Sequence, residues 1–384
     1  MKMFLKYIII LFTRCISRLA FLMPLKKNQI LMYSFAGKQV SDSPKYICDY
    51  IMNQPNNSKY KIIWGVNDPY KYKKLANKQI SYIKYRGMKF LITYLQSEII
   101  ISNMGPIRGL ARRKDQKIIN TWHGGGAYKK DGSAVGYKSG FELLYSEMAM
   151  KDVTVFLSSS KAFTECCIQN AYHYNGRILD VGLPRNDILF DKKRHKDIRN
   201  KVKSFFDLSD DVQIVMFAPT WRNYDLEYEQ IDYTMLLRSL KERFGGEWIA
   251  LHRAHSLMKT EFDSTNEGLI YDATKYPDMQ ELLISIDVLI TDYSSSIWDY
   301  SQLKKPGFLY TPDLEFYDKV FGFSSPIDKW GFDVCSSNAK LRESILEYNE
   351  KIHLKKIKDN HDMYSSYESG HACKSVFEYI EDIS

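Results

Sequence analysis

Short β-rich segments alternate with stretches of helical composition along nearly the whole chain, in two successive series. Continuous apolar segments of this kind are typical of parallel strands that helices cover on both faces. The first series lies at residues 29–35, 61–66, 80–85, 97–102, 117–122, 154–158 and 177–181, and the second at 213–218, 247–251, 268–271, 287–290 and 307–310. A charged stretch at 191–211 separates the two series, and 384 residues exceed what one core usually fills. We therefore predict an α/β fold in which two Rossmann-like domains, residues 28–195 and 196–384, face a cleft.

Residues 1–27 precede this pattern and differ from it. Residues 3–25 are predominantly apolar, but Lys6, Arg14 and Arg18 interrupt them, and Lys26 and Lys27 follow. A membrane-spanning helix needs about 20 apolar residues with charges kept out of its centre, so a spanning anchor fits poorly. Helical spacing separates the apolar side chains from Arg14 and Arg18, which favours an amphipathic helix lying on an anionic membrane surface. A buried first helix is the alternative.

Composition limits the remaining classes. The six cysteines lack the spacing of a metal site, and two are adjacent, so the sequence indicates neither zinc nor a disulfide framework, and a reducing cytoplasm fits best. The net charge of +8 is spread over lysine-rich stretches, which are either solvated faces or contacts for an anionic partner. Nucleic-acid binding would predict aromatic residues interleaved with these runs on one module, and no such module is present in the sequence.

One histidine stands at the end of a predicted buried strand. The run from Ile118 to Trp122 is followed by His123 and then by a loop of small residues, Gly124, Gly125, Gly126 and Ala127. Unhindered backbone N–H groups in such a loop can hold a phosphate beside an imidazole. The pattern therefore indicates chemistry on a phosphorylated substrate, the alternative being an ordinary strand-end histidine beside a turn.

Three strand ends in the second half carry polar groups where a doubly wound sheet binds its ligand. They are Pro219, Thr220 and Arg222 after the first strand, Arg253 and His255 after the second, and Asp292, Ser294, Ser295 and Asp299 after the fourth. The serines precede a predicted helix, so their hydroxyls and the first-turn amides could hold a phosphate. A simple N-cap is the alternative interpretation of the serines.

Taken in order, these motifs resemble the CDP-glycerol:poly(glycerophosphate) glycerophosphotransferase family over roughly residues 30–375. The similar segments are Thr-Trp-His-Gly at 121–124, Val-Gly-Leu-Pro-Arg-Asn-Asp at 181–187, Ala-Pro-Thr-Trp-Arg at 218–222, Arg-x-His at 253–255, Gln-Glu-Leu-Leu at 280–283 and Thr-Asp-Tyr-Ser-Ser at 291–295. The resemblance implies two domains of the GT-B type and peripheral attachment to the cytoplasmic face of a bacterial membrane. It also implies transfer of a polyol phosphate from a CDP-activated donor, CDP-glycerol or CDP-ribitol, to a lipid-linked acceptor in teichoic acid or capsule synthesis.

The resemblance also implies roles for particular residues. His123 matches the family's essential histidine, and a set of other residues matches its donor contacts: Arg185, Pro219, Thr220, Arg253, His255, Ser294, Ser295 and Asp299. The family commonly continues its His-Gly motif with Thr-Pro-Leu-Lys, whereas this chain has Gly125 to Tyr128 at those places.

The chemistry follows from these assignments. His123 is expected to act as general base toward the acceptor hydroxyl, and His255 to stabilise phosphate or protonate the leaving CMP, although the two roles could be exchanged. Neither a cofactor nor a metal site is expected, because no cluster of carboxylates suggests one. A nucleotide-sugar glycosyltransferase on the same architecture is the alternative enzyme, and a non-catalytic protein that binds an anionic polymer is the alternative outside enzymes.

Overall fold

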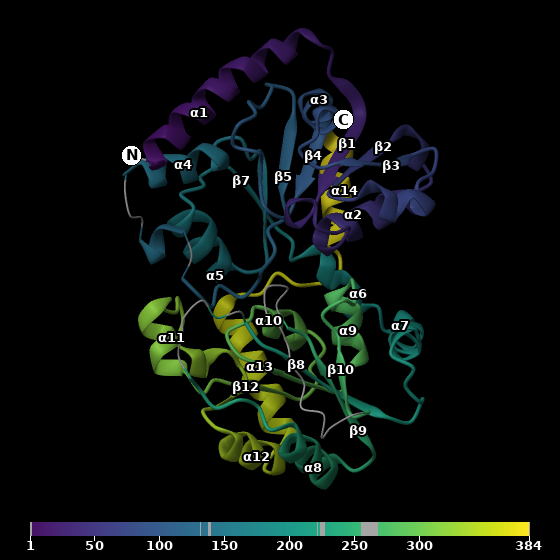
Figure 1. Ribbon diagram of the computed structural model, residues 1–384, viewed down its shortest axis with the longest axis vertical. Coiled ribbons are helices and arrows are strands. Elements are labelled where there is room, and N and C mark those ends of the chain that lie inside the picture. The colour runs from purple at the N-terminus through teal and green to yellow at the C-terminus, as the bar shows by residue number, and fades with distance from the viewer. Residues whose placement is uncertain are drawn as a thin grey trace. The chain divides into compact units, whose positions relative to one another are not determined.

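The computed structural model describes residues 2–130, 132–136, 140–220, 222, 227–254 and 268–383. The chain divides into two compact units, each containing one parallel sheet (Figure 1). Unit 1 comprises residues 1–123, 131–187 and 367–384, and unit 2 comprises residues 124–130 and 188–366. Each unit is described by itself below.

Unit 1 is built on a seven-stranded sheet with the strand order β3-β2-β1-β4-β5-β6-β7. All its strand pairs within the described residues are parallel, with registers such as Ile30 opposite Ile62 and Ile99. The strands are β1 (Lys26–Tyr33), β2 (Lys61–Val66), β3 (Ile80–Lys84), β4 (Ser97–Ser102), β5 (Lys117–Asn120), β6 (Val155–Ser158) and β7 (Arg177–Asp180). The helices of unit 1 are α1 (Lys2–Ser17), α2 (Asp42–Met52), α3 (Met88–Gln96), α4 (Gly140–Met150), α5 (Lys161–Phe163), which continues as a π-helix (Thr164–Ala171), and α14 (Ala372–Ile383).

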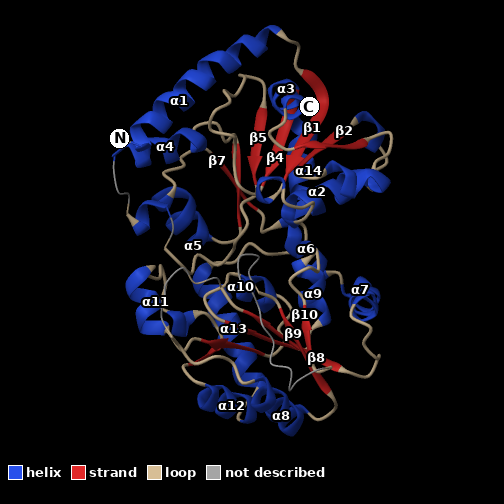
Figure 2. Ribbon diagram, in the orientation of Figure 1, coloured by secondary structure: helices blue, strands red, loops and turns tan. Residues whose placement is uncertain are grey.

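Helices cover both faces of this sheet, which explains why its strands are continuously apolar (Figure 2). Successive residues of β1 point to opposite faces: Ile30 packs with α2 and α14, and Leu31 packs with α3. The helix α14 is held at its first turn by Asp187, whose carboxylate accepts the backbone N–H groups of Ala372 and Cys373 at 3.0 and 2.7 Å. Burial raises the pKa of Asp187, and these two hydrogen bonds oppose that shift.

Unit 2 is built on a six-stranded parallel sheet with the order β10-β9-β8-β11-β12-β13. Its strands are β8 (Gln213–Ala218), β9 (Trp248–His252), β10 (Ile270–Asp272), β11 (Val288–Thr291), β12 (Gly307–Tyr310) and β13 (Asp333–Cys335). Its helices are α7 (Lys192–Phe205), α8 (Tyr233–Phe244), α9 (Met279–Ser285), α10 (Ser296–Ser301), α11 (Leu314–Val320), α12 (Asn338–Leu346) and α13 (Glu350–Tyr364). The short helix α6 (Asp187–Phe190) lies where the chain passes from unit 1 to unit 2.

Both sheets therefore have the strand order 3-2-1-4-5-6 of the Rossmann fold, with one further strand in unit 1. This confirms the predicted α/β class with two parallel sheets. The strand β13 is absent from the predicted series.

The units depart from the predicted ranges 28–195 and 196–384 at three places. A boundary at 195 would cut α7, which packs against α9, and Arg199 of α7 forms an ion pair with Asp287 at 2.9 Å. The C-terminal segment 367–384 belongs to unit 1, because α14 completes the core around Ile47 and Ile51 of α2. Residues 124–130 belong to unit 2 although they follow β5 of unit 1.

The N-terminal helix α1 lies against α4 on the outside of unit 1 (Figure 1). Arg14 is directed inward, where its guanidinium binds Asp152 at 2.6 Å and the carbonyl oxygen of Arg108 at 3.0 Å. Large apolar side chains of this region are exposed, namely Phe4, Leu5, Ile8, Ile9, Leu11, Phe12, Ile16, Leu19 and Leu22. Among the helices that the structure describes, none has both the length and the apolar character that a membrane crossing requires.

The predicted N-terminal segment 1–27 overlaps the sheet, because β1 begins at Lys26. Arg14, which was expected to face an anionic membrane surface together with Arg18, binds a carboxylate of unit 1 instead. Its charge is neutralised by Asp152, and the hydrogen bond to that carboxylate raises the pKa of Arg14 against the opposing effect of burial.

Candidate functional site

His123 lies three residues after the end of β5 and is partly buried beside aromatic rings of unit 1. Its imidazole lies 4.5 Å from the ring of Trp122 and 6.0 Å from that of Phe35, measured between ring centroids. Trp122 is held in the left-handed backbone region at φ 53°, an unfavourable conformation for a bulky residue that recurs at functional sites. Contacts with these two rings therefore restrict the orientation of the His123 imidazole.

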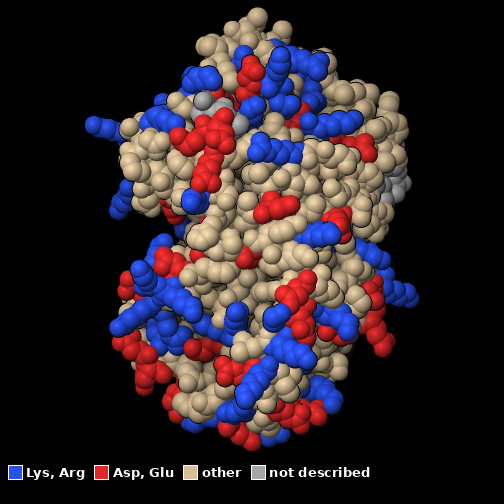
Figure 3. All heavy atoms as spheres, turned by 180° about the vertical axis from the view of Figure 1, so that it is seen from behind, with Lys and Arg blue, Asp and Glu red and all other residues tan. Residues whose placement is uncertain are grey.

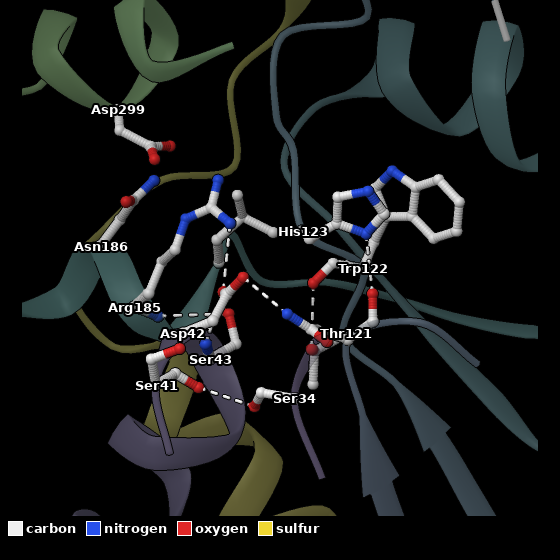
Figure 4. Close-up of polar contacts among 12 residues, drawn as sticks. Ser34, Ser41, Asp42, Ser43, Thr121, Trp122, His123, Arg185, Asn186 and Asp299 are labelled. Atoms are coloured by element: carbon white, nitrogen blue, oxygen red, sulfur yellow. Dashed lines mark hydrogen bonds and ion pairs between the residues drawn. The ribbon is translucent and has the colours of Figure 1, made fainter. Parts of the chain in front are cut away.

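A backbone carbonyl determines which nitrogen of His123 carries the proton. The Nδ1 atom lies 2.8 Å from the carbonyl oxygen of Asn103 (Figure 4). A carbonyl oxygen only accepts hydrogen bonds, so Nδ1 of the neutral ring must donate and Nε2 must hold the free lone pair. In the described part of the chain, Nε2 has no hydrogen-bond partner, so this nitrogen can accept a proton from a substrate hydroxyl.

Arg185 lies in the same polar region of unit 1 but forms an ion pair with a carboxylate. It belongs to a 3-10 helix (Pro184–Asn186) that follows β7, and its Nη1 donates to Oδ1 of Asp42 at 3.1 Å. Both side chains are almost fully buried, at 6% and 5% exposure. This expected donor contact therefore forms a buried ion pair within unit 1, as Figure 4 shows.

The glycine loop after His123 packs closely against other residues of unit 2, to which it belongs. A Cβ atom at Gly125 would lie 2.4 Å from Cδ1 of Trp298, and one at Gly124 would lie 3.2 Å from Oγ of Ser295. Gly126 and Ala127 both have positive φ, at 85° and 51°. The small residues at 124 and 125 thus serve close approach to α10, a role that differs from the expected phosphate-holding loop.

Tyr128, the next residue, anchors this loop among aromatic rings of unit 2. Its ring stacks on Trp330 at 4.3 Å and meets Tyr364 edge-on at 5.5 Å, and its hydroxyl donates to Asn360 at 3.3 Å. The backbone carbonyl of Tyr128 also accepts the N–H of Ser324 at 2.9 Å. In the family's Thr-Pro-Leu-Lys pattern, the position of Tyr128 is a lysine, so an aromatic packing residue stands here in its place.

Arg222 joins two buried carboxylates at the strand ends of unit 2. It forms a hydrogen-bonded ion pair with Asp292, and its Nε and Nη2 donate to Asp313 at 2.9 and 3.0 Å. Burial alone would lower the pKa of Arg222, but the attraction of Asp292 and Asp313 outweighs burial and raises it. Asp292 also accepts the backbone N–H and the hydroxyl of Thr220 at 2.9 and 2.7 Å. Asp292, Thr220 and Arg222 therefore form one internal network at the ends of β8 and β11, and Pro219 lies between β8 and Thr220 in the chain.

Arg253 follows β9 and holds the loop after β10. Its Nη1 donates to the carbonyl oxygens of Ala273 and Tyr276 at 2.8 and 2.9 Å. Burial lowers the pKa of Arg253 to about 10, so the side chain stays charged at neutral pH. The other predicted catalytic residue, His255, lies outside the described residues.

The serine cluster precedes α10, a helix of six residues. Ser295 occupies the N-cap position, yet its side chain makes no capping hydrogen bond, so the alternative of a simple N-cap does not describe it. The hydroxyl of Ser294 lies 3.0 Å from that of Ser296. Asp299 is buried within α10 and accepts a hydrogen bond from Gln280 at 3.0 Å.

The expected residues divide between the units: His123 and Arg185 lie in unit 1, and Thr220, Arg222, Asp292, Arg253, Ser294, Ser295 and Asp299 lie in unit 2. Direct hydrogen bonds join Thr220, Arg222 and Asp292 among them. Three partners were missed from the sequence: Asn103, Asp42 and Asp313. Asn103 follows β4 directly and Asp313 follows β12 closely, so the strand-end rule that selected His123 would have found both. No group of three or more His, Cys, Asp or Glu able to hold a metal occurs among the residues that the structure describes.

Comparison with known proteins gives concordant matches. The family model described as CDP-Glycerol:Poly(glycerophosphate) glycerophosphotransferase matches residues 15–382. A teichoic acid poly(glycerol phosphate) polymerase of Bacillus subtilis is 30% identical over 316 residues, which cover 80% of this chain and 42% of that protein. The protein of the same name from Bacillus spizizenii is 27% identical over 378 residues, covering 94% of each. This chain therefore spans less than half of the first relative and nearly all of the second.

A solved structure of a wall teichoic acid polymerase also matches this chain. The wall teichoic acid polymerase TagF matches with a TM-score of 0.82 and 26% identity, covering 100% of this chain and 97% of that one. TagF has also been solved after a soak with CDPG. With the family model spanning both sheets, the chain belongs to the CDP-glycerol:poly(glycerophosphate) glycerophosphotransferase family.

Proposed function

We propose that this chain transfers glycerol phosphate from CDP-glycerol to a hydroxyl group of a lipid-linked acceptor in teichoic acid synthesis, with release of CMP. The observation that carries the proposal is a family match over residues 15–382 that includes a histidine with a fixed tautomer. CDP-glycerol is favoured over CDP-ribitol because both relatives named above are poly(glycerol phosphate) polymerases.

In the proposed reaction, His123 acts as general base. The acceptor oxygen attacks the phosphorus that carries glycerol, and the hydroxyl proton passes to Nε2 of His123. The P–O bond to CMP breaks, CMP leaves with the bonding electrons, and a new phosphodiester remains on the acceptor. Because Nδ1 already donates to Asn103, Nε2 is the nitrogen that takes the proton. Such a base typically contributes about 100- to 10,000-fold to the rate.

Residues of unit 2 are proposed to hold the donor. Arg253 keeps its charge at neutral pH, and within the described residues its hydrogen bonds to carbonyls come from Nη1. Ser294 and Ser295 supply hydroxyls beside α10, and His255 is proposed to stabilise the phosphate or protonate CMP. Arg222 is left out of direct donor contact, because Asp292, Asp313 and the carbonyl of Thr220 use its guanidinium. The proposal includes no cofactor and no metal, so activity should survive removal of divalent cations by EDTA.

The acceptor is proposed to be reached at the cytoplasmic face of the membrane. The exposed apolar side chains of α1 and of the 3-10 helix that follows it (Arg18–Leu22) could enter the interface of an anionic leaflet. Lys6 and Arg18 are exposed beside them and would add electrostatic attraction. On the face drawn in Figure 3, Lys and Arg are interspersed with Asp and Glu, so the apolar residues rather than a broad basic surface carry this proposal.

The catalytic proposal is tested by incubating the full chain with CDP-glycerol and a lipid-linked acceptor and measuring CMP release. His123→Ala should reduce kcat by at least about 100-fold while melting temperature and CDP-glycerol affinity stay close to the parent values. His173→Ala is the matched control, because His173 is an exposed histidine of the same unit, with Nε2 3.0 Å from Ser133 and Nδ1 4.0 Å from Glu147. A folded His123→Ala enzyme that keeps more than about a tenth of the turnover would exclude the general-base role. Release of UDP from UDP-sugars instead would favour the glycosyltransferase alternative.

The membrane proposal needs a variant that leaves the fold intact. Deleting residues 1–27 would also remove the first residues of β1, so we choose charge substitutions at exposed positions instead. Ile9→Glu with Phe12→Glu should abolish binding to vesicles of anionic lipid, whereas Met88→Glu, at an exposed apolar residue of α3, should not. High salt should weaken binding of the parent chain without abolishing it. Equal binding by all three proteins would refute the proposal.

A further inference from the structure

A buried aspartate is connected to His123 through one intervening residue. Asp42 is the first residue of α2, and its Oδ2 accepts a hydrogen bond from Nδ2 of Asn103 at 2.9 Å. The carbonyl oxygen of Asn103 in turn accepts Nδ1 of His123 at 2.8 Å. Figure 4 shows Asp42 between Arg185 and the strand ends that carry His123.

The amide of Asn103 has only one orientation that satisfies both of its neighbours. Its Oδ1 accepts the backbone N–H of Phe35 at 2.9 Å, and its Nδ2 donates to Asp42. A flipped amide would place an NH₂ group against the N–H of Phe35 and an oxygen against the carboxylate of Asp42, so both bonds would be lost. Because Asn103 is fully buried, no water replaces them. Both polar atoms of the Asn103 side chain are therefore held by hydrogen bonds, and the backbone carbonyl of the same residue, which accepts from His123, is held in place with them.

The backbone around this clamp is strained. Asp42, Phe35 and Trp122 all lie in the left-handed region, with φ of 61°, 47° and 53°. None of them is glycine, and each such conformation persists only where surrounding contacts enforce it. At Asp42 the enforcing contacts are hydrogen bonds from Ser43 N–H at 2.6 Å, from Arg185 and from Asn103. The molecule thus keeps an unfavourable backbone at the residue that fixes Asn103.

We propose that Asp42 is a positioning residue for the transfer reaction, acting through Asn103 to fix the direction and tautomer of His123. This inference rests on the proposed role of His123 as general base. Asp42 does not touch the substrate; it holds the carbonyl that receives Nδ1–H, so that Nε2 faces the acceptor hydroxyl with its lone pair. A shift of about 1 Å in a catalytic group can reduce a rate by about 100-fold, so the arrangement has a measurable effect on turnover.

Replacement of Asp42 by asparagine breaks the hydrogen bond to Asn103 and keeps those from Ser43 and Arg185. It also removes the charge that balances the buried guanidinium of Arg185, so the melting temperature should fall as well. The single carbonyl oxygen of an amide can still accept from Ser43 and Arg185, which both bind Oδ1 of Asp42. The new NH₂ group then points at the NH₂ group of Asn103, and two donors cannot bond to each other. Asp42→Asn should therefore release Asn103, with kcat reduced about 10- to 100-fold and the affinity for CDP-glycerol unchanged.

A double-mutant cycle separates positioning from general destabilisation. Asn103→Ala removes the other side of the same bond, so it should reduce kcat to a similar degree, and the double variant should be no worse than the poorer single one. Ser97→Ala is the matched control: it removes a buried hydrogen bond to Gln29 between β1 and β4, at the opposite end of those strands. It should lower the melting temperature without changing kcat. Multiplicative losses in the cycle, or a loss of kcat in Ser97→Ala equal to that in Asp42→Asn, would overturn the inference.

A spectroscopic measurement tests the inference without turnover. In ¹⁵N-histidine NMR spectra of the full chain, His123 should be the Nδ1–H tautomer in the parent and in Ser97→Ala, and should show a mixture of tautomers in Asp42→Asn. If Asp42→Asn fails to fold, Asn103→Ala carries the same expectation. An unchanged His123 tautomer in both variants would refute the role of Asp42, even if the chain transfers glycerol phosphate. If the parent releases no CMP but the variants show the mixture of tautomers, only the proposed reaction is refuted.

Discussion

Arg222 should be a stabilising residue of unit 2 rather than a contact for the donor phosphate. Its partners Asp292 and Asp313 are 1% and 0% exposed, so removing the guanidinium would leave two buried carboxylates without their shared cation. Breaking a buried ion pair by removing one partner typically costs about 3–5 kcal/mol. We therefore expect Arg222→Met to destabilise unit 2 by about 3–5 kcal/mol at neutral pH.

The assay should report on unit 2 alone, because two units need not unfold together. Hydrogen exchange of peptides from β8 and β11 gives the local free energy of opening beside the network. Arg342→Met is the matched control, since Arg342 pairs with Glu242 at 3.4 Å on the surface, where both side chains are half exposed. Such a pair contributes less than about 1 kcal/mol. Adding Asp313→Asn to Arg222→Met should recover part of the loss, because it removes one of the two uncompensated charges.

Two outcomes would refute this reasoning. The first is a loss in Arg222→Met no larger than that in Arg342→Met. The second is weakened CDP-glycerol binding with unchanged hydrogen exchange, which is the result expected of a residue that contacts the donor directly.

Three further predictions concern unit 2. Gly125→Ala should cost about 1–3 kcal/mol, because its Cβ would lie 2.4 Å from Trp298, and Gly140→Ala, where nothing lies within 4 Å, should be neutral in the same denaturant titration. Tyr128→Ala should cost about 3–5 kcal/mol and Tyr128→Phe less than about 1.5 kcal/mol, since only the latter keeps the ring stacked on its neighbours; equal losses would show that the hydroxyl dominates. Burial lowers the pKa of His252 to about 4, so between pH 6.5 and 4 the unfolded chain binds a proton that the folded chain does not. As the pH is lowered through this window, the free energy of unfolding should fall by up to about 3 kcal/mol, and above pH 6.5 this contribution should be fully present. A His252→Gln variant with the same acid dependence as the parent would contradict this.

The fold could be predicted from the sequence because its strands are buried on both faces. Ile30 and Leu31 both read as core residues, and a run of such residues specifies a parallel strand without any knowledge of its neighbours. The three-residue strand β13 escaped prediction, since Asp333–Cys335 carries no apolar run. The return of α14 to unit 1 also escaped, because an apolar helix face shows that a helix packs but does not show against what.

Site residues could be proposed from the sequence where their position after a strand marks them. They could not be proposed where their role depends on a contact with a residue far away in the chain. His123 was selected as a candidate because a histidine near a strand end can be recognised in the sequence alone. Its tautomer depends on a backbone carbonyl, which every residue possesses, and Asp42 is separated from Asn103 and Arg185 by 61 and 143 residues. Arg222 was predicted to bind substrate, because from the sequence alone a cation near a strand end fits an anionic substrate as well as it fits a buried carboxylate. The glycines after His123 were interpreted as a phosphate loop, whereas Gly125 is small because Trp298 is large and close.

The division of unit 1 along the chain has a consequence for how the protein is made. Residues 367–383 are synthesised after all of unit 2, yet Val376, Tyr379 and Ile380 belong to the core that also contains Ile47. On the ribosome, domains generally fold from the N-terminus onward, but here the sheet that emerges first must wait for its last helix. Nascent unit 1 therefore exposes the apolar surface that α14 later covers, next to α2, while unit 2 is translated. The first half of the chain should then depend most on chaperones.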